Sequence, residues 1–93
     1  PSEKNERIQS LKALEQRSRQ QNETQLFIET PYRNDALLAD AVENLHPETR
    51  LCVATDLTLP TQEIISQTIA QWRKRKEMPN LKKRPTIFVL YSA

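Results

Sequence analysis

Apolar positions along the chain gather into short continuous runs that polar segments separate. Three runs are rich in β-branched, aromatic or aliphatic residues and are bounded by turn-forming residues: 25–29, 51–56 and 86–91. Runs of this length and composition predict strands. Because the runs are continuously apolar rather than alternating, they predict strands that are covered on both faces.

Two other segments have helical periodicity. In residues 3–20 a narrow apolar stripe recurs at helical spacing among charged residues, and Ser2 is placed to cap the start. This pattern predicts a helix that packs along one edge only. A second helix, more apolar, is predicted from Arg33 or Asn34 to the turn at His46 and Pro47.

Residues 61–76 fit two interpretations. One is a single helix from Thr61 to Lys76, and the other is a short strand over 63–67 followed by a helix over 69–75 with Thr68 as its N-cap. In either case strands and helices alternate along the chain. The pattern therefore predicts an α/β fold, a single small layered domain in which helices flank a mixed sheet of three to four strands.

Composition narrows the possible functions. The 93 residues include no glycine, which excludes the dinucleotide-binding fingerprint and Walker-type phosphate loops. The absence is either chance in a short chain or a sign that a glycine-rich loop lies in a part of the protein outside this chain. With a single cysteine (Cys52) and a single histidine (His46), we expect no metal site. No apolar stretch is long enough to span a membrane and no signal peptide is visible, so we expect a cytoplasmic protein.

Two carboxylates follow predicted strands. Glu29 comes after the first apolar run and Asp56 after the second, and ligands of layered sheets bind beyond the carboxyl ends of the strands. The two side chains have two interpretations. They form a general acid and base pair, or they cap the loops that follow the strands.

A basic segment lies between residues 73 and 84, with seven lysines or arginines and one glutamate. Such a run is able to follow a phosphate backbone, and its alternative interpretation is a solvated surface. The candidate contacts to a nucleic acid are Arg73, Lys74, Lys82, Lys83 and Arg84.

Three strings in order carry a resemblance: FIETPYRN at 27–34, TDLTLPT at 55–61 and KRPTIF at 83–88. Together they resemble the carboxy-terminal half of the tetrapyrrole (corrin/porphyrin) methylase superfamily, and within it the branch of ribosomal RNA small-subunit methyltransferase I. The resemblance implies that residues 1–93 form the second lobe of a two-lobe methyltransferase. The N-terminal lobe, with the glycine-rich cofactor loop, would then lie outside this chain.

The resemblance also implies a site. S-adenosylmethionine would lie between the lobes, against Glu29, Thr30, Asp56, Leu57, Thr58, Ser66 and Gln67. Glu29 would act as base or hydrogen-bond acceptor, and Arg33 would bind phosphate or orient Glu29. The implied assembly is a homodimer, and the chain alone is expected to be inactive.

The acceptor is not fixed by these residues. The basic segment favours ribosomal RNA methylated at a ribose 2'-oxygen, and a porphyrin or corrin ring is the alternative substrate. A different class of function, a non-catalytic RNA-binding or dimerisation module, also fits the sequence.

Overall fold

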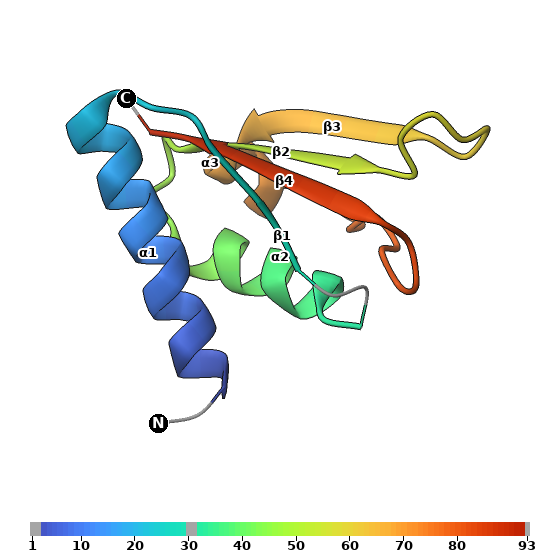
Figure 1. Cartoon of the computed structure of the whole chain (residues 1–93), viewed down its shortest axis with the longest axis horizontal. Helices are drawn as coiled ribbons and strands as arrows, with labels where there is room; N and C mark the ends of the chain where they lie inside the picture. Colours follow the sequence, from blue (N-terminus) through green and yellow to red (C-terminus); the bar gives the residue numbers. More distant parts are fainter. Residues whose placement is uncertain (1–2, 30–31, 93) are drawn as a thin grey trace.

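The computed structural model describes residues 3–29 and 32–92. It confirms the α/β class, with a four-stranded sheet and three helices in the described part of the chain (Figure 1). In chain order the elements are α1 (Glu3–Gln21), β1 (Gln25–Ile28), α2 (Asn34–Asn44), β2 (Arg50–Thr55), β3 (Glu63–Thr68), α3 (Ile69–Arg73) and β4 (Thr86–Tyr91). The predicted cap at Ser2 lies outside the described residues.

The sheet has the order β1-β4-β2-β3, and every neighbouring pair is antiparallel. This differs from the mixed sheet expected from the sequence. β1 and β2 do run in the same direction, and α2 connects them in the sequence. In the sheet, however, β4 lies between the two strands and pairs with both. Because β1 and β2 share a direction, their carboxyl ends lie at the same edge of the sheet.

The ambiguous segment 61–76 folds as a strand followed by a short helix, α3. The Thr68 side chain accepts a hydrogen bond from the Gln71 amide, and the Gln71 side chain accepts one from the Thr68 amide at 2.8 Å. This capping box confirms Thr68 as the N-cap and satisfies two amides that the helix leaves without partners. The interpretation as a single helix is therefore wrong.

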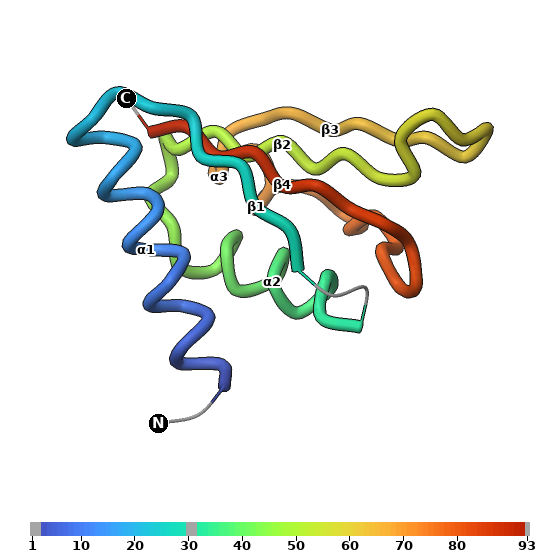
Figure 2. The backbone as a smooth tube through the Cα atoms, viewed as in Figure 1, coloured from blue at the N-terminus to red at the C-terminus, as the bar shows by residue number. Residues whose placement is uncertain are grey.

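One face of the sheet carries the core. α1 and α2 lie on the same side of the sheet, as Figures 1 and 2 show. Trp72 of α3 is fully buried in the same core, and its indole Nε1 donates to the Leu51 carbonyl at 2.9 Å. Phe27 and Phe88 stack with ring centroids 5.4 Å apart. At the centre of this face, strand residues such as Leu51, Val53 and Phe88 are about 1% exposed or less.

The opposite face of the sheet is open. Leu26 is 67% exposed, Ile28 71% and Ile64 54%. In the register of the sheet Ile28 is level with Ile87, Ala54 and Ile64, so four apolar residues form one row across the open face. The expectation that the strands are covered on both faces is wrong for the described residues, because all three helices contribute to a core on one side.

Cys52 lies on this open face and is half-buried. Burial raises the pKa of its thiol, so the side chain stays neutral. In the described ranges, no helix combines the length and the apolar character needed to cross a bilayer.

Candidate functional site at the carboxyl ends of β1 and β2

The structure brings the ends of β1 and β2 to one cavity of about 410 Å³. Glu29 contributes from the end of β1, and Asp56 and Leu57 from the loop after β2. The first residues of β4 lie between these two segments, because β4 separates β1 from β2 in the sheet. The lining residues are Ile28, Glu29, Ala54, Asp56, Leu57, Leu59, Pro85, Thr86 and Ile87.

The cavity has the character of a small-ligand site. Its size lies within the usual range, and its walls are mostly aliphatic with few polar groups. Ile28 and Ile87 belong to the exposed apolar row, so the cavity opens toward the uncovered face of the sheet. A ligand with an apolar body and a cationic or hydroxyl-bearing part matches this combination of aliphatic walls and carboxylates.

Asp56 is a buried carboxylate in a fixed hydrogen-bond network. Its Oδ2 accepts from Arg84 Nε at 2.8 Å and from Thr61 Oγ1 at 2.9 Å. The hydrogen bond from Arg84 lowers the pKa of Asp56 below its ordinary value, so the carboxyl is ionised at neutral pH. Asp56 is therefore not a general acid at that pH, and it anchors the loop that follows β2.

This loop has an unusual backbone. Asp56 has φ of 53° and Thr58 has φ of 68°, both in the left-handed region that favours glycine. A β-branched residue with positive φ is a conformational outlier and costs on the order of 1–3 kcal/mol. The Thr58 amide donates to Gln62 Oε1 at 2.8 Å, which helps to hold the turn. Outliers of this kind concentrate at ligand sites.

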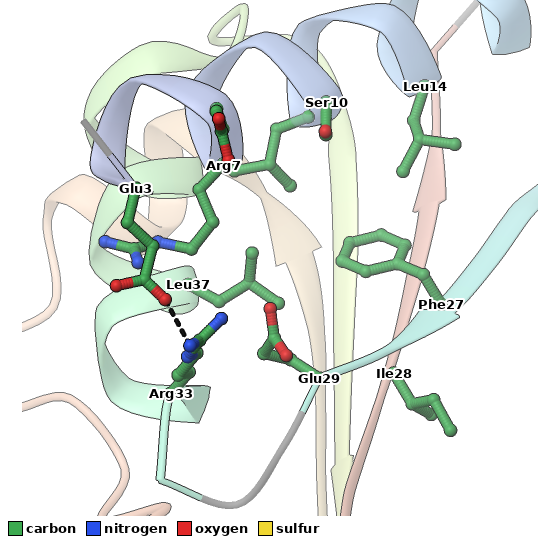
Figure 3. A pocket seen from close by; sticks show the side chains of 11 residues that line it. Glu3, Arg7, Ser10, Leu14, Phe27, Ile28, Glu29, Arg33 and Leu37 are labelled. Carbon is green, nitrogen blue, oxygen red and sulfur yellow. Dashed lines mark ion pairs between the residues drawn. The ribbon is translucent and has the colours of Figure 1, made fainter. Parts of the chain in front are cut away.

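A second cavity, of about 320 Å³, lies between α1, β1 and the start of α2 (Figure 3), and its lining includes Glu29 and Arg33. Figure 3 shows Phe27 directed toward α1 and Ile28 directed away from it. Arg33 forms an ion pair with Glu3 of α1. Glu29 lines both cavities, whereas Arg33 lines only this second one. Thr30, a predicted cofactor contact, lies outside the described residues.

Ser66 and Gln67 are not brought to the 410 Å³ cavity. β3 begins at Glu63, level with Thr55, and Gln67 is level with Leu51 near the other end of β2. At about 3.3 Å per residue, Gln67 lies about 13 Å along the strand from Glu63. Successive residues of a strand face opposite sides, so Ser66 and Gln67 cannot line the same surface. The Gln67 Nε2 atom is buried without a hydrogen-bond partner among the described residues.

The basic segment divides into residues whose side chains bind other parts of the fold and residues whose side chains point into solvent. Arg73 donates from Nε to the Val42 carbonyl and from Nη2 to the Leu45 carbonyl, each at 2.7 Å. It thus binds the carboxyl end of α2, where cations are favourable. Arg84 is engaged with Asp56 in the same intramolecular way. Lys74, Lys82 and Lys83 are exposed, so they are the remaining candidates for phosphate contacts.

Sequence reasoning missed the partnership around Arg84. Asn34 is fully buried, and its Nδ2 donates to the Arg84 carbonyl at 2.9 Å. Both residues lie within strings that carry the resemblance, but nothing in their spacing indicates that they meet. Their separation of 50 residues is closed only by the tertiary fold.

The described residues contain no group of three histidine, cysteine or acidic side chains able to hold a metal ion. No model of a known protein family matches the chain, and no curated protein shows significant similarity to it.

Proposed function

We propose that this chain is the carboxy-terminal lobe of an S-adenosylmethionine-dependent methyltransferase of the tetrapyrrole methylase superfamily. One observation carries the proposal. Glu29, Asp56 and Leu57, which the resemblance assigns to the cofactor, come from two separate segments and line one cavity. Their convergence depends on β1 and β2 having the same direction, which follows from the antiparallel pairing of each strand with β4.

The residues of this cavity fit the proposed cofactor. S-adenosylmethionine supplies an activated methyl group on a sulfonium cation and carries a nucleoside. The aliphatic walls at Ile28 and Ile87 suit the nucleoside, and the carboxylates of Glu29 and Asp56 are able to accept hydrogen bonds from its hydroxyl groups. Methyl transfer of this kind depends chiefly on orientation, so a site without a conventional nucleophile is adequate.

The open face of the sheet supports the two-lobe part of the proposal. The cavity opens toward the exposed apolar row, and the resemblance implies that the cofactor lies between two lobes. We propose the first lobe of the same protein as the occupant of this face. A second copy of this chain on the same face would instead favour the dimerisation module, the candidate from another functional class.

For the acceptor we propose ribosomal RNA, methylated at a ribose hydroxyl in the cytoplasm. Lys74, Lys82 and Lys83 are the exposed cations that support this choice over a porphyrin or corrin ring. Glu29 is the proposed base or hydrogen-bond acceptor for the hydroxyl.

The test uses the protein encoded by the complete reading frame and S-adenosylhomocysteine as the probe, followed by calorimetric titration. We expect micromolar binding that Ile87→Arg weakens at least tenfold, because the new side chain fills the cavity with positive charge. Ala13→Arg is the matched control, since Ala13 is an exposed apolar residue of α1, on the helix-covered side of the sheet, and does not line the cavity. Absence of binding in the unmodified protein, or equal losses in both variants, contradicts the proposal.

A further inference from the structure

The side chain of Arg84 joins three segments around the candidate cavity. Its Nε donates to Asp56, its Nη1 to the Asn80 carbonyl at 2.6 Å, and its Nη2 to the Thr61 carbonyl at 3.0 Å. Nη1 also reaches Glu63 Oε1 at 3.5 Å, at the start of β3. The side chain is only 25% exposed. Both ends of loop 56–62 are therefore bound to one guanidinium.

The backbone of the same segment adds contacts to two further elements, α2 and β4. The Arg84 carbonyl accepts from Asn34 Nδ2 at the first residue of α2 and from Thr86 Oγ1 at the start of β4. The Asp56 amide donates to the Pro85 carbonyl at 2.9 Å. Loop 56–62, β3, β4 and α2 thus meet at Arg84.

Loop 56–62 depends on support of this kind. It contains two left-handed residues without glycine, and such a backbone persists only where surrounding contacts determine it. Leu57 and Leu59, which line the cavity, project from this loop. The shape of the cavity therefore depends on the contacts that fix the loop.

We infer that Arg84 is a positioning residue, which holds loop 56–62 in the conformation that forms the cavity. Arg84 does not line the cavity, so it acts through Asp56 and the loop. The consequence for cofactor affinity rests on the proposed function, whereas the effect on the loop does not.

Arg84→Lys separates positioning from charge. A lysine keeps the positive charge beside Asp56, but its single ammonium cannot reproduce a planar fork that bonds to three segments. Arg73→Lys is the matched control. Arg73 also donates to backbone carbonyls of a neighbouring element, but at the far end of α2 and away from the cavity.

The first measurement is amide hydrogen exchange of this chain. In Arg84→Lys we expect exchange at the Leu59 and Gln62 amides, which bond within the loop, to rise at least tenfold. Exchange at Phe88 in the core should not change, and Arg73→Lys should leave the loop unaffected. Unchanged exchange at Leu59 and Gln62 in Arg84→Lys overturns the inference.

The second measurement is affinity for S-adenosylhomocysteine in the complete protein. We expect Arg84→Lys to weaken binding at least tenfold and Arg73→Lys to leave it within twofold. If Arg84→Lys speeds exchange in the loop but leaves the affinity unchanged, the claim that Arg84 positions the loop for ligand binding is refuted. If the unmodified protein binds no ligand, the proposed function fails, and the exchange experiment still decides the role of Arg84.

Discussion

The two faces of the sheet carry similar apolar side chains, but helices cover only one of them. On the helix-covered face Val53 and Phe88 are almost fully buried, whereas on the open face Ile28 and Ile64 are more than half exposed. Both faces carry β-branched and aliphatic side chains. An apolar strand is thus no proof that its residues are buried within its own chain, and a large exposed apolar surface is a common property of interaction sites.

The two faces of the sheet have different roles. Residues of the covered face stabilise the fold, and residues of the open face border the candidate cavity. Substitutions on the two faces should therefore differ in what they change.

The largest loss of stability is expected for Trp72→Ala on the covered side. The variant removes the largest fully buried side chain and should lower the free energy of unfolding by about 3–5 kcal/mol. Urea denaturation followed by circular dichroism measures the loss. Trp72→Phe is the control; it should cost about 1–3 kcal/mol, because the Leu51 carbonyl loses its indole donor. A decrease of less than about 1 kcal/mol for Trp72→Ala would show that the core is not organised as described.

A matched pair tests the two faces directly. Val53→Thr places a hydroxyl in the covered core and should cost about 1–3 kcal/mol. Ile64→Thr, also β-branched, makes a similar change on the open face and should cost less than about 1 kcal/mol. Both are measured by chemical denaturation. Equal losses would mean that the open face is covered in solution, for instance by a second copy.

A smaller, pH-dependent effect is expected at the edge of the sheet. Arg84 lowers the pKa of Asp56 in the folded chain, so the ion pair contributes stability above the ordinary carboxyl pKa of about 3.9. This contribution is lost as the pH falls through the lowered pKa. Asp56→Asn should thus be less stable than the unmodified chain at pH 7, and the difference should shrink in acid. Thermal unfolding at several pH values measures it; a gap that widens in acid contradicts the assignment.

The smallest effect on stability is expected for the exposed lysines. Reversing Lys74, Lys82 and Lys83 to glutamate should change the free energy of unfolding by less than about 0.5 kcal/mol each. In the complete protein the change should weaken binding to RNA and flatten its salt dependence, with the slope falling by about 0.7–0.9 for each phosphate that is no longer neutralised. Lys12→Glu, at an exposed position of α1, is the control. Unaltered RNA affinity would leave these lysines as a solvated surface.

Local features of the fold were predictable from the sequence. Strands appear where apolar runs are bounded by turn residues, and Thr68 caps α3 because its hydroxyl precedes a helical segment. The direction of β4 and the open face were not predictable, since both depend on how distant segments pack. The meeting of Glu29 and Asp56 at one cavity followed from strand ends, whereas Asp56 and Arg84 are 28 residues apart and gave no local signal.

The central position of β4 has a consequence for synthesis on the ribosome. β4 is the last of the described strands to be translated, yet it bridges β1 and the β2–β3 hairpin, with Gln25 opposite Leu90. Until residues 86–91 emerge, β1 has no strand to pair with and Leu51 and Val53 lack their neighbours on that side. Contacts of such long sequence separation slow folding. The nascent chain therefore exposes unpaired strand edges until residues 86–91 are made, a stage at which chaperones would protect it from aggregation.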